Sequence, residues 1–254
     1  MKLLSLNIWG GRVHDPLISF IKDRAVDTDI FCFQEVYRTT ANVQIVGEVY
    51  ANIYEEIEKT LSDHSGHFAV AEEKRSDIGI TDFDLEYGLA TFTRKSLETK
   101  THDHFFVHKH LGAERSEMGF SGARLLLRNS FEKDGKTFSI ANFHGLHNGL
   151  GKTDSDERLV QSKNIKEFLN QINTPKILCG DFNLLPDTKS IAILEEGMRN
   201  LIKEYEITST RSSFYPKETK FADYVLVSPD IEVLDFKVLQ NEVSDHLPLL
   251  LEFQ

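Results

Sequence analysis

Short apolar segments recur along this chain, and several of them end in an acid, an amide or a histidine. The stretch KILCGDFNLLP, residues 176–186, shows the pattern: a run suited to a buried strand is followed by Gly180, Asp181, Asn183 and Pro186. Asp and Asn are depleted from strands because their side chains compete for backbone hydrogen bonds. Taken alone, this ending is explained equally well by an Asx turn.

The same ending appears in five other segments, which carry Asn7, Gln34 with Glu35, Asn142 with His144, Asp223, and Asp245 with His246. Each polar group stands where a buried strand would otherwise select an apolar residue. Ligand sites in layered α/β proteins form where several strand ends converge. We therefore expect these distant segments to build one common site.

Nine segments have the length and composition of strands, over residues 3–8, 30–33, 67–71, 89–92, 121–127, 137–142, 176–179, 224–227 and 247–253. Helical spacing of apolar residues predicts helices over 43–61, 154–172 and about 189–199. Hairpins mixed with helix crossovers predict an α/β protein with mixed sheets packed face to face and helices outside. No linker or low-complexity tract interrupts the chain, so we expect a single domain over residues 1–254.

The formal net charge of −11 argues against a broad, non-specific hold on nucleic acid or anionic membrane. Cys32 and Cys179 both lie inside apolar runs, which favours burial over a disulfide. The N-terminal apolar run is too short for a signal peptide, and no segment has 18 uninterrupted apolar residues. We expect a soluble, cytoplasmic monomer without membrane insertion.

The acids of these segments suit a divalent cation. Glu35, Asp181 and Asp245 offer hard oxygen donors, and together with Asn7 they could hold a Mg²⁺-like ion. The sequence contains neither a thiolate cluster nor an HExxH helix, which disfavours a structural or protease-type zinc site.

The remaining polar groups suit an anionic oxygen. His144, His246 and Asn183 supply hydrogen-bond donors, and Asp223 could fix the tautomer of His246. A cation, a carboxylate near water and donors for developing charge are the requirements for hydrolysing a phosphate ester. We therefore expect a metal-assisted hydrolase.

Six motifs in order, LNIWG, FCFQEV, ANFHG, CGDFNLLP, ADYVLVS and SDHLPLLLEF, resemble those of the endonuclease/exonuclease/phosphatase superfamily over the whole chain. The resemblance implies a DNase-I-like fold, a four-layer α/β/β/α sandwich of two mixed sheets flanked by helices. It also implies a Mg²⁺ cofactor, with Mn²⁺ as the alternative, and a phosphate-ester substrate.

The resemblance further implies a role for each matching residue. Glu35 would be the principal metal ligand, with Asn7 and Asp245 close by. Asp181 would orient or activate the attacking water and Asn183 would help hold it. Roles at the phosphate would fall to four more residues: His246 as the donor that stabilises the pentacovalent state, Asp223 as its orienting partner, His144 as a second catalytic histidine, and His147 as a phosphate contact.

The motifs narrow the substrate only in part. The inositol-phosphatase branch carries a Trp before its GDxN motif, where this chain has Leu178-Cys179. Ala222, His144 and the net charge depart from the pattern of abasic-site endonucleases. Secreted sphingomyelinases carry an export signal, and none is seen here. The loop HNGLGKTDSDERLVQS loosely resembles deoxyribonuclease-like and tyrosyl-DNA phosphodiesterase-like members.

Three functions follow as hypotheses. The first is a Mg²⁺- or Mn²⁺-dependent phosphodiesterase acting on nucleic-acid ends, nicks or nucleotides. The second is a phosphatase or phospholipase C-like enzyme that acts on a small or lipid phosphoester. The third is a catalytically silent binding module, which the intact polar set disfavours.

Overall fold

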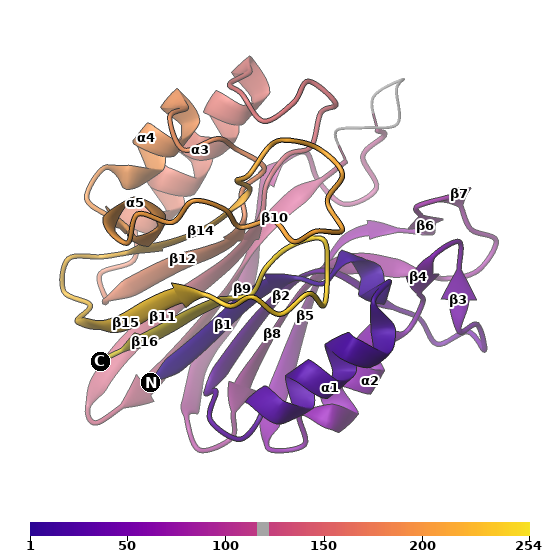
Figure 1. Cartoon of the computed structure of the whole chain (residues 1–254), viewed down its shortest axis with the longest axis horizontal. Coiled ribbons are helices and arrows are strands. Elements are labelled where there is room, and N and C mark those ends of the chain that lie inside the picture. The colour runs from indigo at the N-terminus through magenta and orange to yellow at the C-terminus, as the bar shows by residue number, and fades with distance from the viewer. Residues whose placement is uncertain (116–121) are drawn as a thin grey trace.

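Two six-stranded sheets packed face to face form the centre of the protein, and helices cover both outer faces (Figure 1). The computed structural model describes residues 1–115 and 122–254. The first sheet has the order β15-β16-β1-β2-β8-β5. Its strands are β1 (Lys2–Asn7), β2 (Ile30–Arg38), β5 (His64–Glu73), β8 (Glu86–Arg94), β15 (Val233–Val238) and β16 (Leu249–Phe253).

The second sheet has the order β13-β14-β12-β11-β10-β9. Its strands are β9 (Glu98–His108), β10 (Arg124–Lys133), β11 (Lys136–His144), β12 (Lys176–Asp181), β13 (Arg199–Asn200) and β14 (Asp223–Val227). The predicted hairpin joins β10 to β11, with Asp134 and Gly135 in the left-handed conformation that a two-residue turn requires. Strand β10 matches the prediction over 121–127 from Arg124 onward, and Ser121 lies outside the described residues.

Each sheet contains one parallel pair whose crossover is helical. Strands β1 and β2 are parallel and connected through α1 (His14–Arg24), and β11 and β12 are parallel and connected through α3 (Asp156–Asn170). Helices α1 and α2 (Ile53–Thr60) cover the first sheet, whereas α3, α4 (Lys189–Glu195) and α5 (Leu201–Glu204) cover the second (Figure 1). This arrangement confirms the predicted α/β/β/α sandwich of two mixed sheets.

Alternation along the strands divides the apolar residues between two cores. In β2, Cys32 packs with Leu178 and Cys179 of the facing sheet, while Phe31 and Phe33 pack toward α1 and α2. Both faces of the central strands are covered, so most of their residues are apolar instead of alternating regularly with polar ones. The carboxyl ends of both parallel pairs lie at the same edge of the sandwich, where Asn7 at the end of β1 contacts Asp181 at the end of β12.

The predicted helix over 43–61 is wrong in its first half. Those residues form a short hairpin of β3 (Ile45–Val46) and β4 (Val49–Tyr50), and only Ile53–Thr60 is helical. Gly47 has φ +61°, a conformation that makes the tight turn and ends any helix. The β-branched residues Ile45, Val46 and Val49 favour strands for the same reason that they fit a helix poorly.

Three smaller differences concern helix ends and missed elements. Helix α1 was not predicted, although Leu17, Phe20 and Ile21 form its buried face. The predicted helix near 189–199 stops at Glu195, shortly before Gly197 at φ +75°. Strand β15 at the sheet edge was also missed.

Helix α3 confirms the prediction over 154–172, with Ser155 as its N-cap. In the described part of the chain, no helix is long and apolar enough to cross a membrane.

Candidate active site

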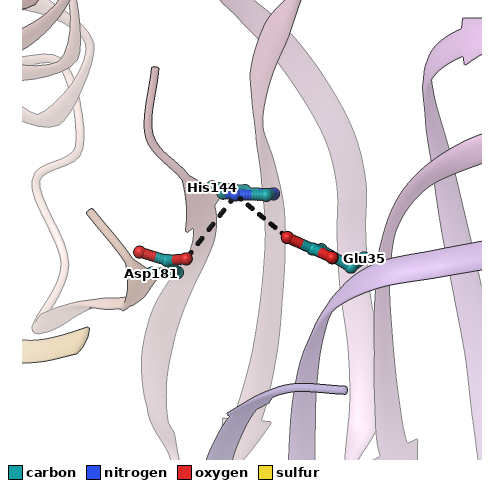
Figure 2. Close-up of side chains that lie close together, drawn as sticks. All are labelled: Glu35, His144 and Asp181. Carbon is teal, nitrogen blue, oxygen red and sulfur yellow. Dashed lines mark ion pairs between the residues drawn. The ribbon is translucent and has the colours of Figure 1, made fainter. Parts of the chain in front are cut away.

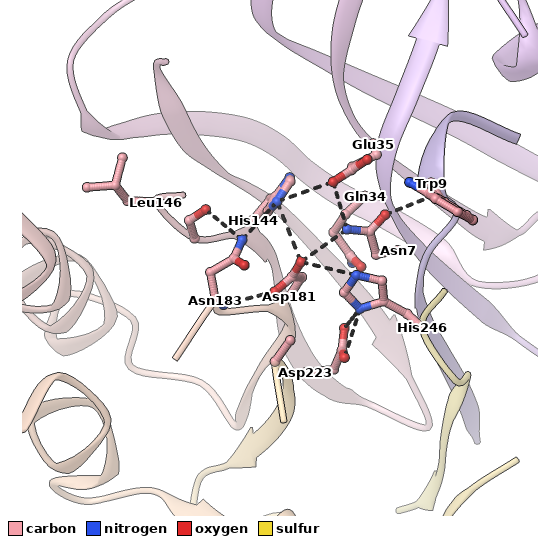
Figure 3. Close-up of polar contacts among 12 residues, drawn as sticks. Asn7, Trp9, Gln34, Glu35, His144, Leu146, Asp181, Asn183, Asp223 and His246 are labelled. Carbon is pink, nitrogen blue, oxygen red and sulfur yellow. Dashed lines mark hydrogen bonds and ion pairs between the residues drawn. The ribbon is translucent and has the colours of Figure 1, made fainter. Parts of the chain in front are cut away.

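Polar side chains from both sheets meet at the edge where the parallel pairs end. Asn7 ends β1, His144 ends β11 and Asp181 ends β12, so the two sheets contribute neighbouring groups. Asp223 begins β14 directly opposite Asp181 in the antiparallel register. Figure 3 shows these residues converging with His246 on one point.

A bulge in β2 directs Glu35 into this group. The register of β2 against β8 shifts between Phe33 and Val36, and Glu35 has φ +57°. A non-glycine residue is disfavoured in that conformation, and bulges of this kind re-aim a side chain. Glu35 thereby comes to lie 3.8 Å from His144 Nε2, which is itself 3.6 Å from Asp181 Oδ2 (Figure 2).

Burial and the nearby carboxylates oppose the ionisation of Glu35. Burial raises the pKa of Glu35, and the charge of Asp245 raises it further. Ligand atoms of Glu35, His144 and Asp181 all lie within 4.8 Å of one another. A half-buried carboxylate whose ionisation is opposed by its neighbours fits a site that binds a hard divalent cation.

Asn7 connects the two carboxylates through its amide nitrogen. Its Nδ2 donates to Glu35 Oε1 and to Asp181 Oδ2, both at 3.1 Å, while its Oδ1 accepts from the backbone N–H of Trp9 at 2.9 Å. The oxygen therefore faces the Trp9 backbone instead of the carboxylates. Direct coordination of a cation by Asn7 would require rotation of this amide.

Asp181 lies at the centre of the site and is ionised at neutral pH. The residue is 1% exposed, and burial alone would raise its pKa. The positive charges of His246 and Lys152 are the largest opposing causes, and they hold the pKa well below its usual range. A carboxylate with so low a pKa is a weak proton acceptor, so it is better suited to orienting a water molecule than to deprotonating it.

The pair of His246 and Asp223 has the geometry of an oriented imidazole. His246 Nδ1 lies 2.8 Å from Asp223 Oδ1, and Thr210 Oγ1 donates to Asp223 Oδ2 at 2.8 Å. Burial lowers the pKa of His246, but Asp223, followed by Asp181 and Asp245, outweighs it and raises the pKa overall. Nδ1 therefore donates to Asp223, and Nε2 lies on the side of Asp181, 3.5 Å from its Oδ2.

Arg211 is a residue of this site that the sequence pattern did not reveal. Its Nη1 lies 2.8 Å from Asp245 Oδ2 and 2.6 Å from His246 Nε2. Arg211 stands in a loop rather than at a strand end, and its backbone pairs with that of His246 in an isolated antiparallel bridge. An anionic oxygen beside Arg211 could accept hydrogen bonds from its guanidinium group.

Asn183 is held in a defined orientation on the other side of Asp181. Its φ is +55°, its backbone N–H donates to Asp181 Oδ1 at 2.8 Å, and its Nδ2 lies 3.3 Å from His144 Nε2. Its Oδ1 accepts from Lys152 Nζ at 2.6 Å. Lys152 is a second cation that the sequence pattern did not reveal.

The two remaining histidines are neutral near pH 7. Burial, followed by the charge of Arg124, lowers the pKa of His144 well below its usual value, and Tyr87 Oη lies 3.2 Å from its Nδ1. Burial and the charges of Lys152 and Arg124 lower the pKa of His147 to about 4. His147 is half-buried near these cations.

Gln34 and Asn142 do not belong to the site, contrary to the expectation from their strand ends. Gln34 Nε2 donates to Asn142 Oδ1 at 2.7 Å, and Asn142 Nδ2 donates to the carbonyl oxygens of Phe33 and Ala90 at 3.1 and 3.0 Å. These bonds connect the two sheets inside the sandwich. His144 ends β11 at the edge of the sheet, whereas Asn142 lies two residues earlier, inside the sandwich. The sequence pattern does not distinguish these two positions.

The low pKa of His144 predicts a pH-dependent stability. The folded state binds fewer protons than the unfolded state below about pH 6.5, so stability is present above that pH and is lost as pH falls. We expect His144→Gln to reduce the slope of unfolding free energy against pH between 5 and 6.5 by up to about 1.4 kcal/mol per pH unit. Urea titrations in chelator, with the exposed His110→Gln as control, measure this slope. Parallel curves for wild type and His144→Gln would contradict it.

The layered fold and the edge site together define the DNase-I-like class of α/β/β/α proteins. The sequence pattern of the endonuclease/exonuclease/phosphatase family matches residues 4–246, and the chain belongs to this family, whose members are phosphoester hydrolases.

Solved structures show the same fold at low sequence identity. The mannosyl-6-phosphatase Bt3783 of Bacteroides thetaiotaomicron is 17% identical with a TM-score of 0.74, covering 100% of this chain and 99% of that one. The catalytic domain of human Nocturnin, with a bound sulfate anion, is 19% identical with a TM-score of 0.67, covering 100% and 93%.

A curated relative matches over a shorter stretch. UPF0294 protein YE0917 of Yersinia enterocolitica is 31% identical over 125 residues, which are 48% of this chain and 44% of that protein. The match thus spans less than half of that relative.

Proposed function

We propose that the protein is a divalent-metal-dependent phosphodiesterase that hydrolyses nucleic-acid ends or nucleotides by in-line attack of water. The observation that carries this proposal is the position of Asp181, whose Oδ2 lies 3.5 Å from His246 Nε2 and 3.6 Å from His144 Nε2. An ionised carboxylate and two imidazoles around one small space suit a water molecule beside a phosphoryl group.

In this proposal each group has one task. Glu35 and Asp245 would hold Mg²⁺, which when bound supplies charge neutralisation and polarises a phosphoryl oxygen. Asp181 orients the attacking water, and Asn183 holds it on the opposite side. His246, oriented by Asp223, donates to a phosphoryl oxygen.

The charge of the chain bears on the size of the substrate. The net charge of −11 favours ends and small substrates over a long nucleic-acid surface.

A second candidate is a phosphatase that acts on a small phosphate monoester. The fold it shares with a mannosyl-6-phosphatase supports this reading. The two candidates differ in the charge of the substrate and in the effect of salt, since nucleic-acid binding weakens steeply as salt rises.

Metal-dependent turnover tests the proposal. We expect hydrolysis of bis-p-nitrophenyl phosphate or a short oligonucleotide in Mg²⁺ or Mn²⁺, and none in chelator. p-Nitrophenyl phosphate and a sugar phosphate assay the second candidate under the same conditions. Failure of every phosphoester in every metal would overturn both.

The acid at the β2 bulge provides a sharper test. Removing the charge of Glu35 weakens cation binding more than it disturbs the phosphoryl contacts, so Glu35→Gln is expected to raise the Mg²⁺ concentration for half-maximal activity by about tenfold or more. Glu86→Gln is the matched control, because Glu86 lies on neighbouring β8 and pairs with Arg38. Equal Mg²⁺ requirements in the two variants would exclude Glu35 as a ligand.

A further inference from the structure

Lys152 is a buried cation in the loop between β11 and α3. Its residue exposure is 8%, and its Nζ donates to Asn183 Oδ1 at 2.6 Å. The backbone is held as well, since its carbonyl oxygen accepts from the N–H of Leu185 at 2.8 Å. The ammonium group therefore has a fixed place beside the residues that surround Asp181.

The other buried cations nearby have partners that account for them. Arg158 donates to three backbone carbonyls, those of Leu146, Gly151 and Thr153. Arg124 donates to the carbonyls of Ala123 and Gly145. These contacts satisfy the two guanidinium groups and fix the loop, so both are structural and neither is a free phosphate contact.

Lys152 differs because its ammonium group has one neutral side-chain partner in place of a set of backbone carbonyls. Among residues 1–115 and 122–254, no carboxylate oxygen lies within 4.0 Å of Lys152 Nζ, and the hydrogen-bond partner of Nζ is the neutral amide of Asn183. Burial lowers the pKa of Lys152 to about 8, against the opposing charge of Asp181, so the group is still cationic at pH 7. A buried ammonium without an ion pair is costly to the folded state.

We infer that Lys152 binds a non-bridging oxygen of the phosphoryl group, in the substrate and in the phosphate product. The inference deepens the proposed function and rests on it. Lys152 and the pair of Arg211 and His246 reach the surroundings of Asp181 through different residues, since Lys152 contacts Asn183 whereas Arg211 contacts His246. A tetrahedral anion between them would meet cationic donors from two directions.

A purely structural role makes the opposite prediction. If Lys152 served only to orient Asn183, loss of its hydrogen bond would destabilise the fold and leave anion affinity unchanged. If it binds phosphate, removal of a buried charge without an ion pair would not lower stability, whereas anion affinity would fall.

Calorimetric titration with inorganic phosphate in Mg²⁺ separates the two roles. We expect Lys152→Met to raise the Kd for phosphate about 10- to 100-fold, as for loss of a charged hydrogen bond, with Tm equal to or above that of the wild type. The exposed Lys163→Met on α3 is the matched control and is expected to leave both quantities unchanged. Unchanged phosphate affinity in Lys152→Met would overturn the inference.

A second variant covers the case in which Lys152→Met lowers stability. Lys152→Gln keeps a donor for Asn183 and removes the charge, and we expect it to lose phosphate affinity while it retains the Tm of the wild type. Wild-type affinity in Lys152→Gln would assign Lys152 to positioning alone. Absence of phosphate binding by the wild type, together with absence of turnover, would instead count against the proposed function.

Discussion

Asp181→Asn is expected to lower phosphoester hydrolysis by about 10³-fold or more while the fold remains intact. Asparagine has the same shape and keeps an oxygen that can accept from the backbone N–H of Asn183. It lacks the negative charge that holds the attacking water between the two imidazoles. The loss should therefore appear in kcat, with little change in the unfolding transition.

His246→Gln tests the opposite side of the same reaction. Glutamine can donate one hydrogen bond, but it carries no charge and does not form the ion pair with Asp223 that orients His246. We expect a loss of similar size, measured as kcat against a chromogenic diester at saturating Mg²⁺.

The control for both variants lies close in sequence. Asp187 is exposed six residues after Asp181, and Asp187→Asn should retain the turnover of the wild type. Full activity in both Asp181→Asn and His246→Gln would falsify the assignment of this edge as the active site. Circular dichroism and melting temperature confirm that any loss is not due to unfolding.

Asn142→Ala is expected to cost about 3 kcal/mol or more of unfolding free energy. Asn142 is fully buried and joins Gln34 of the facing sheet to two carbonyl groups there. Its removal leaves several buried polar groups without partners, and each of these carries a desolvation cost.

Urea denaturation with a matched variant measures the effect. Asn129 lies in the same sheet and is equally buried, but its side chain makes one hydrogen bond, to His67. Asn129→Ala should therefore cost clearly less, about 1 kcal/mol. The prediction fails if the two variants unfold at the same urea concentration. Combining Asn142→Ala with Gln34→Ala should cost less than the two single changes together.

Much of this architecture could be predicted from alternation and strand length. The apolar runs that end at Asn7 and Asp181 are strands β1 and β12, and the helical spacing after Ser155 is α3. The polar residues at their ends come together because parallel strands from both sheets open at one edge. The resemblance of six ordered motifs supplied the order of the layers.

The parts that could not be predicted depend on three-dimensional position. Lys152 and Arg211 stand in loops without periodicity, so nothing in their neighbourhood distinguishes them from solvated cations. Asn142 and His144 follow the same two-residue alternation, yet Asn142 connects the two sheets and His144 lies in the active site. The prediction of a helix over 43–61 was wrong in its first half because it relied on apolar spacing alone and did not account for the turn at Gly47.

Two of the central side chains, Glu35 and Asn183, stand on backbone in the left-handed conformation, at φ +57° and +55°. That conformation costs roughly 1 kcal/mol or more for a residue with a Cβ, and glycine would adopt it without penalty. Selection of this protein for heat resistance alone would therefore favour glycine at these two positions. Thermostability campaigns should hold both positions fixed, because the most stable descendants would be those that had lost their chemistry.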